Sequence, residues 1–209
     1  MKFLSIFLLF SLNMHAQGPS VVAKKIKIVT TLTVLQKITE ELAKDKAIVS
    51  SLTLPNEDPH FIREKPTFKS VLKDADMLIA IGNGLEIWLK KVLIATQNPK
   101  ILESANGFIN VSQNTRLLEV PANVSKSQGD IHPQGNPHIW LSPMLVLKIA
   151  YNITNFLIKN DNENKDFYMK NYNLFKNNLT RSMFGESIAK SYSADFLWKL
   201  KEGGKLQEY

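Results

Sequence analysis

Residues 77–84 read Met-Leu-Ile-Ala-Ile-Gly-Asn-Gly, and this stretch decides how the chain folds. A run of five apolar residues that ends at a glycine-rich turn is typical of a buried β-strand rather than a helix, which needs a longer stretch. We therefore expect residues 77–81 to form a strand and residues 82–84 to end it.

Three further stretches outside this run also predict strands, at residues 25–31, 47–54 and 107–111. Segments with apolar residues at helical spacing separate them, and Thr31 or Thr33 is expected to cap the first helix. A helix through Ile87 and Trp88 is expected after the glycine turn. Parallel neighbours need crossover connections, so this alternation predicts an α/β fold, a parallel four-stranded sheet flanked by helices.

The second half of the chain predicts a different organisation. Residues 117–137 are rich in Pro, Asn, Ser, Gln and Gly and predict a loop, after which Pro143 opens a long helical stretch. We expect an N-terminal lobe at 24–143, a linking helical spine at 144–183, and a stub of a second, incomplete lobe at 184–209.

The N-terminus predicts export. Lys2 precedes a short apolar run at residues 3–12, and Ala16 supplies the small residue of a cleavage site. We therefore expect residues 1–16 to be a cleaved signal peptide and the mature protein to be periplasmic.

Composition narrows the function further. Lys and Arg number 26 against 19 Asp and Glu, a net charge of +7, but the basic residues are scattered singly among Asn and acidic residues. This pattern indicates a solvated surface, and we expect no nucleic-acid partner. The chain has no cysteine, which excludes disulfides, thiolate sites and an anchor attached to an N-terminal cysteine. His, Asp and Glu remain as metal ligands.

Three histidines follow the predicted signal peptide, and all lie in loops that contain proline: His60, His132 and His138. Two of them share a pattern, Asp58-Pro59-His60 and Asn136-Pro137-His138, in which the proline restricts the backbone before the imidazole. Neutral imidazole binds zinc, manganese and related ions, and such sites take three or four protein ligands. His60 and His138 are therefore predicted to contribute to one metal site.

The roles of the neighbouring residues stay open. His132 is a third ligand, a residue of a metal-capturing loop, or a solvated side chain. Asp58 and Glu57 are candidates to orient His60 by accepting a hydrogen bond from its ring, and Asp58 is equally a candidate turn cap.

Enzymatic functions find little support. The Gly82-Asn83-Gly84 turn does not continue into a dinucleotide fingerprint, because residue 87 is isoleucine, and the chain has no P-loop, HExxH or GxSxG motif. A metal-dependent hydrolase built on His60 and His138 would need a carboxylate base from Asp58, Glu57 or Glu86. We expect no catalytic residues and no enzyme.

The order and spacing of several motifs resemble a known family, the zinc- and manganese-binding solute-binding proteins of bacterial ABC importers, of the ZnuA/TroA type. The motifs are Asp58-Pro59-His60, Ala75-Asp76 before the third strand, Gly82-Asn83-Gly84-Leu85-Glu86-Ile87-Trp88, and Gly135-Asn136-Pro137-His138-Ile139-Trp140-Leu141-Ser142-Pro143. The resemblance extends from about residue 26 to about residue 179. Ser142 stands where the family usually has Asp.

This resemblance implies a binder of two lobes that are joined by a long helix and hold one metal ion between them. His60 and His138 match the family's first two ligands, and the other two would come from a C-terminal lobe beyond the given sequence. We thus expect a C-terminally truncated, monomeric member. It would capture Zn(II), or alternatively Mn(II), for an ABC permease in the inner membrane. The alternative is a remnant with weak metal binding or an interaction role.

Overall fold

The computed structural model describes residues 24–120 and 132–206. The predicted signal peptide and the middle of the loop predicted at 117–137 lie outside the described residues. None of the helices within the described ranges has both the length and the apolar character needed to cross a membrane.

A four-stranded parallel sheet forms the centre of the fold and confirms the predicted architecture. Its strands are β1 (Ile26–Thr30), β2 (Ala47–Ser51), β3 (Met77–Ala80) and β4 (Phe108–Asn110), in the order β2-β1-β3-β4. In β1, Ile28 pairs with Val49 of β2 on one side and with Met77 of β3 on the other. Because the chain leaves β1 in one direction across the sheet and β2 in the other, the topological switch point lies between β1 and β3. Ligands of open α/β sheets bind at this point, outside the carboxyl ends of the strands.

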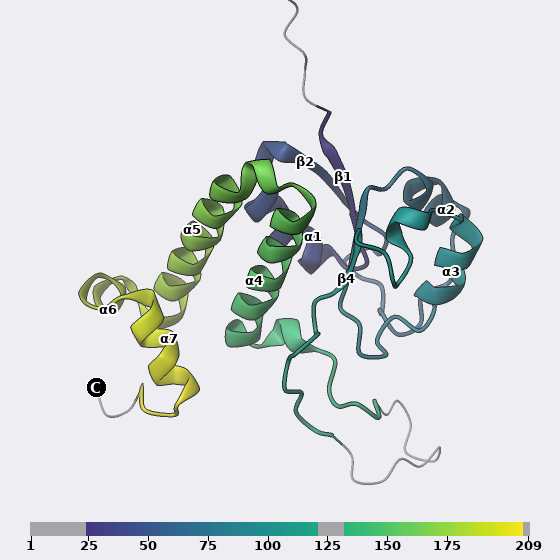
Figure 1. Ribbon diagram of the computed structural model, residues 1–209. Helices are drawn as coiled ribbons and strands as arrows, with labels where there is room; N and C mark the ends of the chain where they lie inside the picture. The colour runs from purple at the N-terminus through teal and green to yellow at the C-terminus, as the bar shows by residue number, and fades with distance from the viewer. Residues whose placement is uncertain (1–23, 121–131, 207–209) are drawn as a thin grey trace, which may run out of the picture.

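Helices cover both faces of this sheet (Figure 1). The main helices are α1 (Thr33–Ala43), α2 (Pro66–Lys73), α3 (Leu89–Thr96), α4 (Pro143–Asn160) and α5 (Lys165–Phe184). Residues of β3 alternate between two cores: Ile79 packs with the α1, α4 and α5 layer, whereas Leu78 and Ala80 pack with α2 and α3. All four residues of β3 are buried, as expected for an interior parallel strand.

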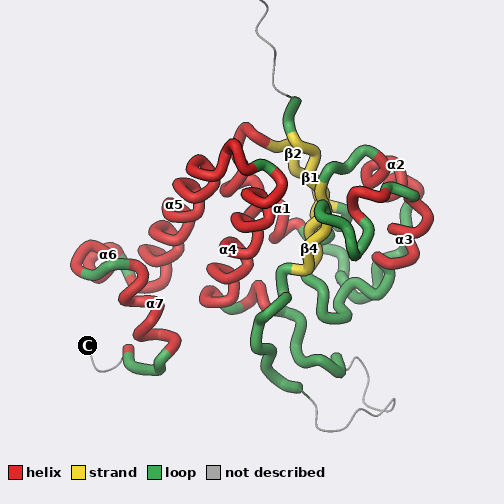
Figure 2. Tube along the Cα trace, viewed as in Figure 1, coloured by secondary structure: helices red, strands yellow, loops and turns green. Residues whose placement is uncertain are grey.

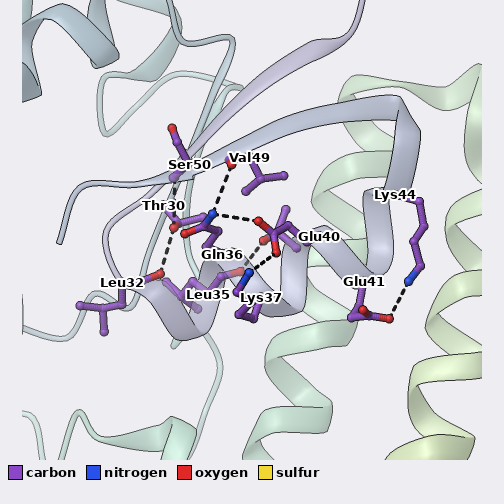
Figure 3. A network of polar contacts seen from close by, with 11 residues as sticks. Thr30, Leu32, Leu35, Gln36, Lys37, Glu40, Glu41, Lys44, Val49 and Ser50 are labelled. Atoms are coloured by element: carbon purple, nitrogen blue, oxygen red, sulfur yellow. Dashed lines mark hydrogen bonds and ion pairs between the residues drawn. The ribbon is translucent and has the colours of Figure 1, made fainter. Parts of the chain in front are cut away.

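Polar contacts fix α1 against the edge strand β2 (Figure 3). The Gln36 amide donates to Glu40 Oε1 at 2.8 Å and to the Val49 carbonyl at 3.4 Å. The predicted cap of α1 is wrong, because Leu32 occupies the N-cap position and the Thr31 hydroxyl donates to Glu86 instead. Thr30 closes the same turn by donating to the Leu32 carbonyl at 2.9 Å.

The helix predicted through Ile87 and Trp88 starts later than expected. Residues 83–88 are turns, α3 begins at Leu89, and the Ile87 side chain is 75% exposed. The cause is the preceding turn, in which Gly82, Asn83 and Gly84 all have positive φ, at 81°, 55° and 77°. Three successive residues in this region are incompatible with a right-handed helix.

Helices α4 and α5 lie against each other and against α1, and they occupy the residues predicted as a spine (Figure 1). The Asn171 amide of α5 donates to the Leu42 carbonyl near the end of α1, at 2.9 Å. Two short helices follow, α6 (Glu186–Ser191) and α7 (Ala194–Glu202), and Trp198 anchors α7 by donating to the Thr180 hydroxyl at 2.8 Å. Single 3₁₀ turns are η1 (Lys44–Lys46), η2 (Pro99–Ile101), η4 (Ile139–Leu141) and η5 (Asn162–Asn164). That these helices link two lobes stays a prediction.

Candidate metal centre

Two long connections carry the three predicted histidines to the carboxyl edge of the sheet. His60 lies between β2 and α2, and His132 and His138 lie between β4 and α4. These connections are the loops drawn in green that gather below the strands (Figure 2). The location agrees with the general position of ligand sites in this fold class.

The three imidazoles lie together. His60 Nε2 is 3.1 Å from His132 Nε2. The ring centroid of His138 is 5.1 Å from that of His60 and 6.1 Å from that of His132. The structure therefore brings all three predicted histidines into one cluster, although they come from distant parts of the sequence.

Both Asx-Pro-His segments adopt the same local arrangement. Asp58 Oδ1 accepts hydrogen bonds from the His60 backbone N–H at 3.0 Å and from His60 Nδ1 at 2.8 Å. Asn136 Oδ1 accepts from the His138 backbone N–H at 2.9 Å and from Nδ1 at 2.8 Å. A ring nitrogen that donates in this way carries the hydrogen, so Nε2 of each ring carries the lone pair that a metal needs.

Asp58 thus caps the turn and also binds the His60 ring, so both roles considered for this residue are present. The two hydrogen bonds from His60, that of the backbone N–H first, lower the pKa of the Asp58 carboxyl. The Glu57 carboxylate instead accepts from Lys65 Nζ at 2.6 Å and from the Leu54 N–H at 2.7 Å. These bonds, that of Lys65 foremost, lower the Glu57 pKa. A role of Glu57 toward His60 stays a prediction.

The distance between His60 and His132 is close to what a shared metal ion requires. Two imidazole nitrogens bound tetrahedrally to zinc lie ~3.3 Å apart, given bond lengths of about 2.0–2.1 Å. Within the described ranges, however, no three His, Asp or Glu side chains are already placed to enclose an ion. With Nδ1 of His60 donating to Asp58, a neutral His60 accepts at Nε2, and His132 supplies the hydrogen between the rings. A metal ion would have to replace that hydrogen.

Neighbouring elements hold the histidine loops in place. The Trp88 indole donates to the Pro59 carbonyl at 2.9 Å, directly before His60. The Asn83 amide donates to the Gly135 carbonyl at 3.1 Å and so ties the turn after β3 to the loop that carries His138. The segment after β3 therefore contacts both histidine loops, through Asn83 and through Trp88.

A buried carboxylate that sequence reasoning did not assign a structural role connects the strands beneath the site. Glu86 Oε1 accepts from the Thr31 hydroxyl at 2.6 Å and from the Ile81 N–H at 2.8 Å, and Oε2 accepts from the Gly82 N–H at 2.9 Å. Burial raises the Glu86 pKa, against the effect of these hydrogen bonds. Thr31 directly follows β1 and Glu86 follows β3, so this cluster closes the switch point. An acidic residue four positions after a strand-ending glycine was the available signal.

Comparisons with known proteins agree with this architecture. The iron-binding protein YfeA of Yersinia pestis is 29% identical over 154 residues, which cover 74% of this chain and 45% of that protein. The manganese ABC transporter substrate-binding lipoprotein PsaA of Streptococcus pneumoniae is 29% identical over 184 residues, covering 85% and 56%. The chain spans about half the length of the curated relatives it matches.

A solved structure is also similar to this chain over about half of its own length. A zinc-bound ZnuA deletion mutant superposes with a TM-score of 0.64 at 31% identity, covering 76% of this chain and 55% of that one. The model of the family described as zinc-uptake complex component A, periplasmic, matches residues 28–183. This range includes all three histidines and α4, all but the first two residues of the sheet, and all but the last residue of α5. By this match, the chain belongs to the zinc-uptake complex component A family.

Proposed function

We propose that the protein binds Zn(II) through His60, His138 and His132 as the solute-binding component of an ABC importer. The observation that carries this proposal is the pair of Asx-Pro-His turns, which fix Nδ1 of two clustered imidazoles as the donor. A ring oriented in this way presents Nε2 to a metal without having to choose a tautomer. The family match and the PsaA and ZnuA likenesses support the assignment of transport to this geometry.

Zinc is the favoured cargo, with Mn(II) as the alternative. The clustered donors are imidazole nitrogens, for which zinc has a higher affinity than manganese or iron. The relatives PsaA and YfeA are named for manganese and iron. Additional oxygen ligands in this site would favour manganese over zinc. Ligands beyond the three histidines would come from water or from chain outside the described residues.

Metal binding rather than catalysis is the proposed role of the site. A hydrolase would need one of the nearby carboxylates as a base. Glu86 is buried against Thr31 and two backbone N–H groups, Glu57 is paired with Lys65, and Asp58 is bound to His60. All three carboxylates thus have structural partners. The family match runs through the whole site, so the alternative of a remnant with another role is not favoured.

The cellular setting follows from the same proposal. The protein would act in the periplasm as a monomer after cleavage of residues 1–16, and would pass its ion to an inner-membrane permease. The mass of the protein recovered from the periplasmic fraction checks the cleavage, and light scattering of the purified protein checks the oligomeric state.

Titration calorimetry with zinc and manganese tests the function. We expect one zinc ion per chain with a weaker response to manganese, and loss of zinc binding in both His60→Ala and His138→Ala. Lys190→Ala, at an exposed ion pair on α6, serves as the matched control and should bind as the wild type does. Zinc binding that is indifferent to both histidine substitutions would contradict the proposal.

A further inference from the structure

We infer that Asn136, held in one orientation by Glu119, is the positioning residue of the His138 imidazole. The inference rests on the proposed function and deepens it, because it assigns the residues that prepare one ligand for its metal. Asn136 Oδ1 accepts from His138 Nδ1 at 2.8 Å, while Asn136 Nδ2 donates to Glu119 Oε2 at 2.8 Å.

The Glu119 carboxylate, together with the His138 backbone N–H that donates to Oδ1, determines which way the amide faces. An asparagine side chain can rotate by 180°, which exchanges its oxygen and its nitrogen. A carboxylate only accepts, so it pairs with Nδ2 and turns Oδ1 toward His138. With the oxygen on that side, the His138 ring must carry its hydrogen on Nδ1. Glu119 therefore acts on the metal-binding nitrogen through two hydrogen bonds.

The backbone of the same loops keeps this pair in register. The Asn136 N–H donates to the Leu118 carbonyl at 2.8 Å, so the segment before Glu119 runs beside the segment before His138. Gly135 permits this approach, since it has φ +105° and a Cβ there would lie 2.7 Å from the Leu118 carbonyl oxygen. Asn136 is thus fixed by its backbone and by both ends of its amide.

The comparison with His60 explains why a second residue is needed. Asp58 offers two equivalent oxygens and needs no partner to choose between them. Asn136 offers one acceptor and one donor, and two partners select its orientation: the His138 backbone N–H at Oδ1 and the Glu119 carboxylate at Nδ2. We accordingly expect Glu119 to matter for His138, because it binds the amide that accepts from that ring.

The test combines zinc titration with ¹⁵N spectra of the histidine rings in the metal-free protein, recorded above the pH at which histidine is charged. The wild type should show a single His138 tautomer with the hydrogen on Nδ1. Asn136→Leu should show mixed tautomers and a zinc affinity lower by about 10–100-fold, the range for lost partners of a ligating histidine. Asn136→Ala, which removes the same acceptor without added bulk, should behave alike.

A paired substitution provides the rescue. Asn136→Asp combined with Glu119→Gln restores an acceptor toward His138 and a donor beside it, and should recover both the tautomer and most of the affinity. Glu119→Gln alone should give a smaller loss than Asn136→Leu, because glutamine accepts or donates and no longer fixes the amide. An Asn136→Leu protein that keeps the wild-type tautomer would overturn the inference.

The two proposals fail in different experiments. His138→Ala in the zinc titration decides whether the site binds the ion. The tautomer of His138 is read without metal and decides whether Asn136 positions the ring. A lower affinity in Asn136→Leu with an unchanged tautomer would indicate a structural role and would also overturn the positioning.

Discussion

His60 Nε2 and His132 Nε2 lie 3.1 Å apart, although 72 residues separate them in the chain. The intervening residues include α2, β3, α3 and β4, so this contact depends on how these elements pack. The sequence predicted a partner for the His60 ring, Asp58, but left the role of His132 open.

Replacement of His132 tests whether this contact belongs to the metal site. A direct ligand should contribute at least as much as an indirect partner of a ligand, so His132→Ala should lower zinc affinity by at least about tenfold. His60→Ala serves as the reference variant, because Asp58 orients that ring. An unchanged dissociation constant in calorimetry would mean that His132 is a solvated neighbour.

Substitution of Trp88 by phenylalanine should loosen the loop before His60. The change keeps the aromatic core contact with Phe68 but removes the donor to the Pro59 carbonyl. We expect a free energy of unfolding lower by about 1 kcal/mol, the usual contribution of one hydrogen bond, and a severalfold weaker zinc affinity.

Trp198→Phe is the matched control for that variant. It removes a similar hydrogen bond, to the Thr180 hydroxyl, from an equally buried indole in α7. Its stability loss should be alike and its zinc affinity unchanged. Equal effects of the two variants on zinc would show that the Trp88 contact acts through global stability alone.

The two glycines of the turn after β3 should differ in their tolerance of alanine. Both have positive φ, which costs an L-residue about 1–2 kcal/mol. A Cβ on Gly82 would also lie 2.7 Å from Asn110 Cγ, whereas one on Gly84 meets nothing within 4 Å. Urea unfolding should therefore show Gly82→Ala less stable than Gly84→Ala by about 1–3 kcal/mol, the cost of overpacking. Equal losses would argue against the close approach of β4.

The buried Glu86 carboxyl should make stability depend on pH. Its pKa is raised by burial, so the folded state keeps the proton to a higher pH than the unfolded state does. Stability from this group is therefore present below the unfolded pKa of about 4.3 and is lost as pH rises through the folded value. Relative to Glu86→Gln, the wild type should lose free energy of unfolding as pH rises over this window.

Urea unfolding of both proteins at several pH values measures this difference. Glu86→Gln should itself cost about 1–3 kcal/mol, because its amide nitrogen would face the Gly82 or Ile81 N–H. Thr31→Val removes the hydroxyl partner and should raise the Glu86 pKa further. If the difference in free energy of unfolding between the wild type and Glu86→Gln does not change with pH, the raised pKa of Glu86 is refuted.

Much of this fold was predictable because its signals are local. The apolar run at 77–81 and the three other strand-like stretches correspond to β3, β1, β2 and β4, with small changes at their ends. Proline before His60 and before His138 marked rigid turns, and Asp58 was predicted as the ring partner of His60. Asn136 plays the same part for His138, although no role was predicted for it from the sequence. These features depend on residues within three positions of each other.

The errors arose where distant residues decide the outcome. Thr31 reads as a helix cap, but Glu86 binds its hydroxyl across 55 positions. The error at Ile87 is a local one instead: it fits a helical spacing, yet the consecutive positive φ angles at residues 82–84 delay the helix. His132 has no local pattern, and its place beside His60 depends on how the loop after β4 folds back. Glu119 reaches Asn136 for the same reason.

The contact between His60 and His132 also bears on how metal binding would affect the stability of the fold. An ion held by both rings would form a reversible cross-link between the two ends of a 72-residue segment that contains β3 and β4. Closing a long loop restricts the unfolded chain, and a ligand bound only by the folded state, at 100 times its dissociation constant, adds about 2.7 kcal/mol of stability. The loaded lobe would then resist opening at the edge strand β4, and release of the ion would restore that freedom.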